Sequence, residues 1–171
     1  MKFVFRFAGL ALLSALLFGC GEDAAEEKFR QELVDKALND DVSKAGAAFL
    51  QKNALMEGVV TTKSGLQYKV LKQGEGERPS ITDLVTVHYE GTRVDGHIFD
   101  SSYQRGEPSV FPLNRVIRGW TEGLMMMNRG STWMLFVPSA LAYGATSPTD
   151  DIPANSTLIF KVELIDFTAA E

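Results

Sequence analysis

The residues of this chain that could do chemistry form an aromatic set with few polar groups beside it. Asp100 directly follows Phe99 and would need a partner if it were buried. A concave apolar pocket with a few fixed polar groups has the general form of a ligand site. The combination predicts such a pocket, although each aromatic taken singly is more often part of a core. The set lies in segments that alternate toward one face of a sheet and comprises Tyr89, Phe99, Asp100, Trp120, Tyr143 and Phe160.

Other catalytic arrangements find little support in the sequence. It contains no glycine-rich phosphate loop, no paired-histidine metal motif and no nucleophile elbow. Ser101 and Ser102 lack an obvious histidine base, so we interpret them as turn hydroxyls. His88 precedes Tyr89 on a strand and should point to the opposite face, which favours a surface histidine. The methionines at 125–127 are most simply core filling.

Composition and charge narrow the classes of function. The formal net charge of the 171-residue chain is −5, so its charge does not suggest nucleic acid as a partner. A single cysteine, Cys20, excludes an intramolecular disulfide framework, and His88 and His97 supply too few ligands to argue for zinc. We therefore expect neither a metal nor another cofactor. With 45% hydrophobic residues, the chain suits one globular domain plus a leader or tail.

The elements that must position the aromatic set are mainly strands. From Leu66 onward the hydrophobic period is two, as in half-buried strands. Val94-Asp95-Gly96 indicates a turn, residues 117–124 a short helix, and residues 140–155 a long loop. The result is an α+β fold in which an antiparallel sheet lies against one short helix. The predicted strands are residues 66–70, 84–89, 133–137 and 158–164.

Two helical patterns precede the strands. The first places Phe29, Leu33 and Ala37 four residues apart, and the second runs from about residue 42 to residue 57, with Gly58 as its C-cap. These helices are too short and too sparsely apolar to make a core of their own. They must pack on the next domain, pack on a partner chain, or stay partly frayed.

Residues 1–19 have the pattern of a lipoprotein signal peptide. Two basic residues precede an apolar run that is too short for a bilayer-spanning helix, which needs about 20 residues. The run ends in Leu17-Phe18-Gly19-Cys20, which resembles the bacterial lipoprotein box, whose cysteine receives a diacylglyceryl group. We therefore predict a lipid anchor on Cys20, and Gly21 after it favours the outer membrane, facing the periplasm. The alternatives are an uncleaved anchor, or ordinary secretion with an unmodified cysteine.

The segment from Gly65 to Phe167 resembles the FKBP-type peptidyl-prolyl isomerases. Several motifs in order and with compatible spacing carry the resemblance, which makes it highly specific. They are Val87-His88-Tyr89-Glu90-Gly91-Thr92, Asp95-Gly96-His97-Ile98-Phe99-Asp100-Ser101-Ser102, Val116-Ile117-Arg118-Gly119-Trp120-Thr121-Glu122-Gly123, Ala142-Tyr143-Gly144, and Thr157-Leu158-Ile159-Phe160-Lys161-Val162-Glu163-Leu164.

Upstream, residues 48–54 and 57–59 resemble the linker helix of the macrophage infectivity potentiator subgroup. Those bacterial proteins dimerise through a longer helical segment. Between Cys20 and Gly65 this chain has only a shortened version of that segment, so dimerisation stays open.

The resemblance implies a half-wrapped antiparallel sheet around the short helix, with an isomerase site between them. It implies catalytic roles for Tyr89, Asp100 and Tyr143, with Arg105 balancing Asp100. Proline-containing polypeptides would be the substrates, and macrolide inhibitors could occupy the same pocket. A non-enzymatic chaperone or binding module with this fold is the alternative. The implied substrate-binding residues are Phe99, Phe111, Val116, Ile117, Trp120, Ile152 and Phe160.

Three positions depart from the best-known family pattern. Ser109 stands where an aromatic is usual, Pro148 where histidine is frequent, and Asp151 where the neighbour of Ile152 is apolar. These departures concern the rim of the pocket more than its floor, so they bear on substrate preference. The division of the chain that follows is a signal peptide at 1–19, a lipidated tether with helices at 20–64, and an isomerase domain at 65–171.

Overall fold

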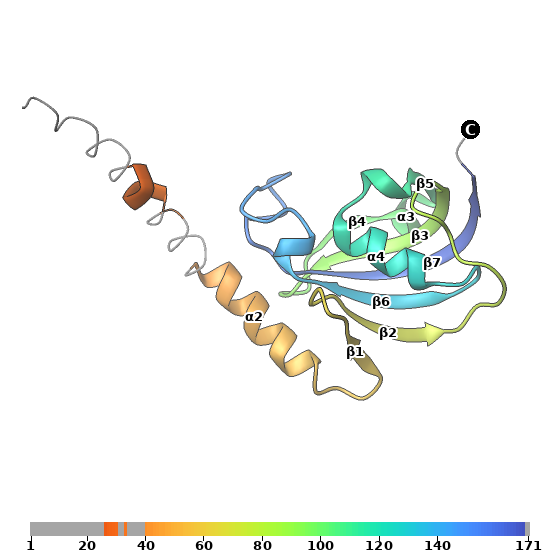
Figure 1. The fold of residues 1–171 in the computed structure, drawn as a ribbon, viewed down its shortest axis with the longest axis horizontal. Coiled ribbons are helices and arrows are strands. Elements are labelled where there is room, and N and C mark those ends of the chain that lie inside the picture. Colours follow the sequence, from red (N-terminus) through yellow and green to blue (C-terminus); the bar gives the residue numbers. More distant parts are fainter. Residues whose placement is uncertain (1–25, 31–32, 34–39, 170–171) are drawn as a thin grey trace, which may run out of the picture. The chain divides into compact units, whose positions relative to one another are not determined.

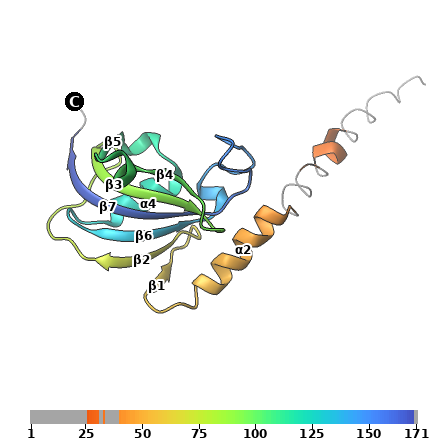
Figure 2. The same ribbon diagram turned by 180° about the vertical axis from the view of Figure 1, so that it is seen from behind.

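The computed structural model describes residues 26–30, 33 and 40–169. Within residues 40–169 the main element is a seven-stranded antiparallel sheet in the order β1-β2-β6-β7-β3-β4, with β5 also paired to β3. The sheet curves around one short helix, α4, as Figures 1 and 2 show from opposite sides. The predicted α+β fold is therefore confirmed. The strands are β1 (Val59–Thr61), β2 (Gln67–Lys72), β3 (Leu84–Arg93), β4 (Ile98–Ser101), β5 (Ser109–Pro112), β6 (Thr132–Val137) and β7 (Leu158–Thr168).

Strand β3 contributes several of the buried side chains on the inner face of the sheet. It pairs along its whole length with β7 on one side and with β5 and then β4 on the other. Successive side chains of a strand point to opposite faces, so Val85, Val87 and Tyr89 are buried while their neighbours are only partly covered. The His88 side chain accordingly points to the outer face, where its ring stacks on Tyr103 with 4.7 Å between centroids.

The helix α4 (Arg118–Met126) approaches strand β6 closely because two of its residues have no side chain. A Cβ at Gly119 would lie 2.4 Å from Cγ1 of Val137, and one at Gly123 would lie 2.8 Å from Cδ1 of Leu135. Glycines four residues apart share one helix face, so this face can lie directly on the sheet. Fully buried side chains of the core between them include Leu66, Leu113, Leu124, Met127, Leu135, Leu158 and Leu164.

The second predicted helix is present as α2 (Asp41–Asn53) and ends earlier than predicted. Asp40 is its N-cap and accepts a backbone hydrogen bond from the first turn. After Asn53 the chain turns toward β1, and backbone N–H groups in this turn donate to the carbonyl three residues earlier, as Met56 does to Asn53. Met56 therefore lies outside the helix and is 62% exposed. Gly58, with φ +80°, serves this turn and is not a helix cap.

Helix α2 packs on the sheet domain, which was one of three predicted alternatives. Gly46 is buried against Thr157, and the ring of Phe49 lies 5.9 Å from that of Phe136. The side chain of Gln67 on β2 joins the contact by donating to the Leu50 carbonyl at 3.0 Å and accepting from Asn53 at 2.8 Å. These bonds tie the end of the helix to the sheet.

The residues described before Asp40 are helical at 26–30 and 33. Phe29 and Leu33 are exposed there, at 62% and 52%. Ala37, the predicted signal peptide and Cys20 lie outside the described residues. Among the described helices, none combines the length and the apolar character that crossing a bilayer requires. Two 3₁₀ turns, η1 (Leu113–Arg115) and η2 (Ser139–Leu141), and the short helix α3 (Ser102–Arg105) complete the domain.

Candidate active site

A cavity of about 290 Å³ lies between α4 and the strands that bend around it. Its walls come from segments far apart in the sequence: Tyr89 from β3, Phe99 and Asp100 from β4, Phe111 from β5, and Trp120 from α4. The fold thus brings the predicted aromatic set together. The other lining residues are Arg115, Val116, Ile117, Tyr143 and Phe160.

Trp120 is the centre of an edge-to-face cluster of rings. It is 4% exposed, and its ring lies 5.1 Å from Tyr89, 5.8 Å from Phe111 and 5.3 Å from Phe160, each at more than 80°. Edge-to-face pairs contribute about 0.5–1.5 kcal/mol each beyond their buried area. The cluster therefore gives the cavity an apolar floor whose rings are held in fixed orientations.

Gly91 on β3 leaves the space that two of these rings occupy. A Cβ at this position would lie 2.6 Å from the Phe99 ring and 2.9 Å from the Phe160 ring. In the sheet register Gly91 pairs with Phe160 on one side and Asp100 on the other. The absent side chain lets Phe99 and Phe160 meet edge to face at 5.7 Å.

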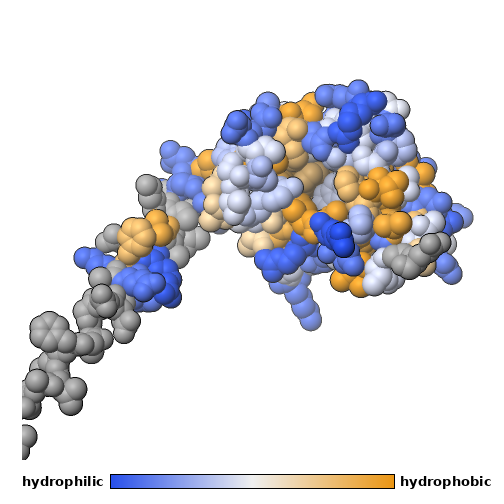
Figure 3. Space-filling view, turned by 90° about the horizontal axis from the view of Figure 1, so that it is seen from above, coloured by the Kyte–Doolittle hydropathy of each residue, from blue (hydrophilic) through white to orange (hydrophobic). Residues whose placement is uncertain are grey.

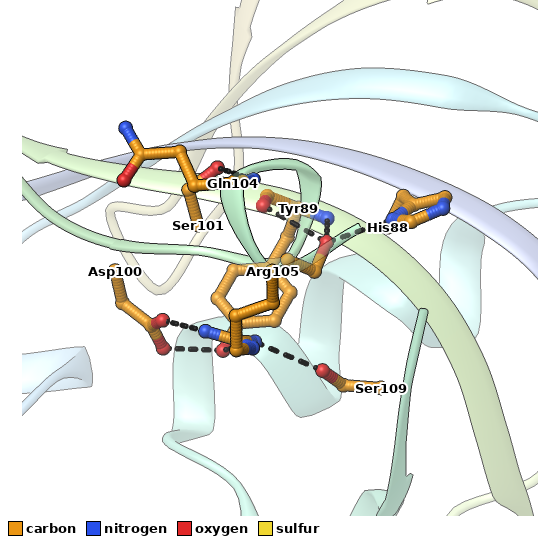
Figure 4. A network of polar contacts seen from close by, with 8 residues as sticks. His88, Tyr89, Asp100, Ser101, Gln104, Arg105 and Ser109 are labelled. Carbon is orange, nitrogen blue, oxygen red and sulfur yellow. Dashed lines mark hydrogen bonds and ion pairs between the residues drawn. The ribbon is translucent and has the colours of Figure 1, made fainter. Parts of the chain in front are cut away.

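One polar network crosses the aromatic wall. The Tyr89 hydroxyl donates to one oxygen of Asp100, and the Arg105 guanidinium forms an ion pair with the other. Arg105 also donates to the Tyr89 hydroxyl at 3.1 Å and to the Ser109 hydroxyl at 3.0 Å. Figure 4 shows Arg105 lying between Asp100 and Ser109. The FKBP resemblance implied that Arg105 would balance Asp100, and the two side chains do form an ion pair.

Ser102 fixes the backbone of Tyr89. Its buried hydroxyl accepts from the Tyr89 N–H at 2.7 Å, and it lies 3.2 Å from the Tyr89 carbonyl oxygen and 2.9 Å from Nδ1 of His88. The hydroxyl has one proton, so it can donate to only one of the two other groups, the Tyr89 carbonyl or Nδ1 of His88. Ser101 instead caps α3 by accepting from the Gln104 N–H at 3.3 Å. Both serines are thus structural, and Ser102 does more than stabilise a turn.

The electrostatics of the pocket keep its hydroxyl groups neutral. Burial raises the pKa of Tyr89, and the hydrogen bond to Asp100 adds to this effect while Arg105 opposes it. Burial, followed by the charge of Asp100, also raises the pKa of Tyr143. Hydrogen bonds to Tyr89 and Asp100 raise the pKa of Arg105. The pocket therefore has two neutral phenols at physiological pH, and the guanidinium of Arg105 beside it stays charged and paired.

A second hollow, of about 370 Å³, lies between α2, the β3–β4 turn and residues 153–157. It is larger, but no aromatic ring or hydroxyl–carboxylate pair lines it. The aromatic cavity is thus the better candidate for a prolyl or similar apolar ligand. In the part of the chain that the structure describes, no cluster of three or more His, Cys, Asp or Glu could hold a metal ion.

Comparison with known families agrees with this geometry. The model for the FKBP-type peptidyl-prolyl cis-trans isomerase matches residues 75–165. The chain belongs to this family. A second model, for the domain amino terminal to FKBP-type peptidyl-prolyl isomerases, matches residues 20–70.

Bacterial members of the FKBP family are similar over most of this chain. A probable FKBP-type peptidyl-prolyl cis-trans isomerase FkpA of Neisseria meningitidis serogroup B is 46% identical over 159 residues, covering 88% of this chain and 58% of its own. The outer membrane protein MIP of Legionella longbeachae is 45% identical over 149 residues, covering 84% and 64%. The crystal structure of FkpA from Escherichia coli superposes with a TM-score of 0.75 at 42% identity, covering 88% and 71%. The chain thus spans only part of the length of the curated relatives that it matches.

Of the catalytic and substrate-binding residues that the FKBP resemblance implied, all but Ile152 line the cavity. The Ile152 side chain is 5% exposed and packs in the core, and its N–H donates to the Thr149 carbonyl at 3.1 Å. The structure adds Arg115, which the sequence analysis missed. The only signal for Arg115 was its place directly before the Val116-Ile117 motif.

Proposed function

We propose that this protein is a peptidyl-prolyl cis-trans isomerase that accelerates rotation about X-Pro bonds during protein folding. The observation that carries the proposal is the closed ring cluster around Trp120 with the Tyr89–Asp100 pair set into its wall. An apolar floor suits a prolyl ring, and a few fixed polar groups suit the flanking amides. The family of the chain supports the same conclusion. No observation favours a non-enzymatic binding module.

The reaction requires stabilisation of a twisted amide rather than bond cleavage. Uncatalysed rotation has an activation energy of about 20 kcal/mol, because amide resonance is lost on the way. The apolar cavity disfavours the charge-separated planar amide and so binds the twisted form better. Each 1.36 kcal/mol of this preference gives about a tenfold faster rotation. No proton transfer, metal or cofactor takes part in this mechanism.

Each site residue has a role in the proposal. Trp120 forms the floor under the prolyl ring, and the Tyr143 hydroxyl, 41% exposed as a residue, donates to a substrate carbonyl. Tyr89 and Asp100 fix the polar side of the wall. The Ile152 N–H can serve a substrate carbonyl only by giving up its bond to Thr149. The walls are Phe99, Phe111, Val116, Ile117 and Phe160.

The substrates are unfolded polypeptide segments that contain proline. Such segments carry apolar side chains, and this domain offers apolar surface to them: Val110 is 58% exposed. Hydrophobic residues gather in patches on the face of the molecule shown in Figure 3, with hydrophilic residues between them. Macrolides that fill the same aromatic cavity would compete with these segments.

The test is an exchange experiment on the chain from Gly21 onward. Magnetisation exchange between the cis and trans signals of a blocked Ala-Pro peptide is measured by NMR with and without micromolar protein. The proposal expects faster exchange that a macrolide inhibitor abolishes. If folded protein does not raise the exchange rate above its uncatalysed value, the proposal is refuted.

The cellular location is a second part of the proposal. We infer that residues 1–19 are removed, that Cys20 carries a lipid, and that residues 20–64 link the anchor to the isomerase domain at 65–171 in the bacterial envelope. The name of the Legionella relative, an outer membrane protein, supports an outer membrane location. That the domain faces the periplasm is part of the proposal. Palmitate labelling and processing sensitive to globomycin are expected. A Cys20→Ala protein that stayed with the membrane fraction would contradict the lipid anchor.

A further inference from the structure

Arg115 is a cation of the pocket that no protein group neutralises. It ends the turn η1, is exposed, and lines the cavity together with the aromatic rings. Its guanidinium has no hydrogen bond or ion pair with any residue described at 26–30, 33 or 40–169. The two other arginines near the site differ in this respect, because Arg105 is held by Asp100 and Arg118 donates to the Ala140 carbonyl.

The carboxylate of the pocket forms no ion pair or hydrogen bond with Arg115 in the described structure. Asp100 is the one acidic residue among the cavity-lining residues described, and both of its oxygens are engaged, one by the Tyr89 hydroxyl and one by Arg105. The positive charge of Arg115 therefore faces whatever enters the cavity. A guanidinium presents N–H donors in a planar fork that matches a carboxylate.

We propose that Arg115 makes this site favour an acidic over a neutral polar or basic residue beside the proline. The inference rests on the proposed isomerase function and specifies its substrate class. The net charge of the whole chain, −5, repels acidic segments at long range. A preference for them must therefore arise from local contact at the pocket, which is the contribution that Arg115 makes.

The size of the expected substrate preference follows from the exposure of Arg115 to solvent. An ion pair between solvent-exposed groups favours association about two- to fivefold at low salt. The Debye length shrinks to about 3 Å at 1 M salt, which removes most of this effect. The preference should therefore be modest, local and dependent on ionic strength.

The experiment compares blocked peptides that differ only beside the proline. Glu, Gln or Lys is placed before the proline in one series and after it in the other. The ratio kcat/KM is measured by NMR exchange at low salt and at 1 M NaCl. For at least one series we expect the Glu peptide to exceed the Lys peptide about two- to fivefold at low salt, with the Gln peptide between them and the difference lost at high salt.

Substitutions assign the preference to one side chain. Arg115→Gln should equalise the three peptides, Arg115→Glu should reverse their order, and Arg115→Lys should keep part of the preference. Lys72→Gln is the matched control, since Lys72 is exposed on β2 outside the cavity and its loss changes the net charge equally. Thermal unfolding verifies that each variant is folded, and the exposed position of Arg115 predicts no change there.

Two results would overturn the proposal: equal kcat/KM for the Glu and Lys peptides of both series at low salt, or a preference that survives in Arg115→Gln. Peptide affinity is measured in parallel by NMR titration. If folded protein isomerises no peptide, the proposed function fails, and the titration still decides whether Arg115 selects acidic segments.

Discussion

Asp100 lies between two donors, the phenol of Tyr89 and the guanidinium of Arg105. Its side chain is 40% exposed, so the ion pair itself contributes little to stability. Its importance lies in geometry, because it sets the orientation of the Tyr89 hydroxyl and of Arg105 at the wall of the cavity. Function should therefore respond to Asp100 more strongly than stability does.

Replacing Asp100 by alanine should lower kcat/KM for prolyl peptides about tenfold or more, because a hydrogen bond to a charged group contributes about 1.5–3 kcal/mol and about 1.36 kcal/mol corresponds to tenfold. Tyr89→Phe keeps the ring contact with Trp120 and removes only the hydroxyl, so its loss should be smaller. Peptide exchange by NMR measures both, and circular dichroism verifies the fold. Full turnover in a folded Asp100→Ala protein would remove Asp100 from the mechanism.

Ser109 occupies a position where the family usually has an aromatic, and here it accepts a hydrogen bond from Arg105. Ser109→Ala should free one donor of Arg105 and lower kcat/KM about twofold, a small effect because the site is exposed. Ser109→Thr keeps the hydroxyl and should restore the rate. Equal rates for the Ala and Thr variants would show that the bond to Arg105 has no influence on turnover.

The raised pKa values of Tyr89 and Tyr143 predict the behaviour of the protein in alkali. Folding raises both pKa values above the usual value of about 10. The protonated phenols therefore contribute fully to the free energy of unfolding below that pH, and this contribution is lost as the pH rises through the folded-state pKa. Turnover should stay level between about pH 6 and 9, since both phenols remain protonated. Urea unfolding at increasing pH tests this, and Tyr89→Phe should weaken the alkaline loss of stability.

At the scale of elements, the contact between α4 and β6 depends on glycine. An added methyl at Gly119 meets Val137, and overpacking of this kind costs about 1–3 kcal/mol, of which about 1 kcal/mol is returned by helix propensity. We therefore expect Gly119→Ala to lower the free energy of unfolding by about 1 kcal/mol in urea titrations. Met125→Ala, at a position that is 40% exposed, is the control and should change it little.

A second substitution can confirm that contact with Val137 causes the loss of stability in Gly119→Ala. Val137→Ala removes the methyl groups that a Cβ at residue 119 would meet. The double variant Gly119→Ala with Val137→Ala should then lose less stability than the sum of the two single variants. Additive losses would show that the close approach of α4 to β6 is not the reason for the effect.

The sequence predicted the elements whose pattern is long and regular. Strands β3 and β7 alternate because one face is buried, and α4 follows from the motif that carries Trp120. Strands β2 and β6 were also predicted, although burial does not alternate along the whole of either strand. Strands β1 and β5 were not predicted, since three or four residues at the side of a sheet are too few to show a period.

For the site, the direction of a side chain could be predicted only on a regular element. Tyr89 and Phe160 were placed correctly because a strand fixes which face they share. Ile152 was expected in the cavity and lies outside its lining, because an irregular loop gives no such rule. Arg115 was missed because a single arginine in a sequence reads as an ordinary surface charge. That it lines the cavity without an ion-pair partner among the described residues can be seen only in the structure.

At the scale of the whole molecule, β7 lies between β6 and β3 and joins the two halves of the sheet. Removing residues 158–171 should leave a chain without a cooperative unfolding transition, because β3 and β6 each lose one of their partners along their whole length and no longer belong to one sheet. Near-ultraviolet circular dichroism and a urea titration measure this. A truncated protein that still unfolded cooperatively would show that β7 only completes a sheet that is stable without it.

The central place of β7 has a consequence for how the protein is made. Residues 84–93 pair with residues 158–168, so the ribosome must synthesise every other described strand before this sheet can close. Pairing over such a separation is slow, because loop-closure entropy must be overcome before the contacts form. A chain that cannot close its sheet early stays unfolded during synthesis, a state in which a protein of the proposed envelope location could be exported.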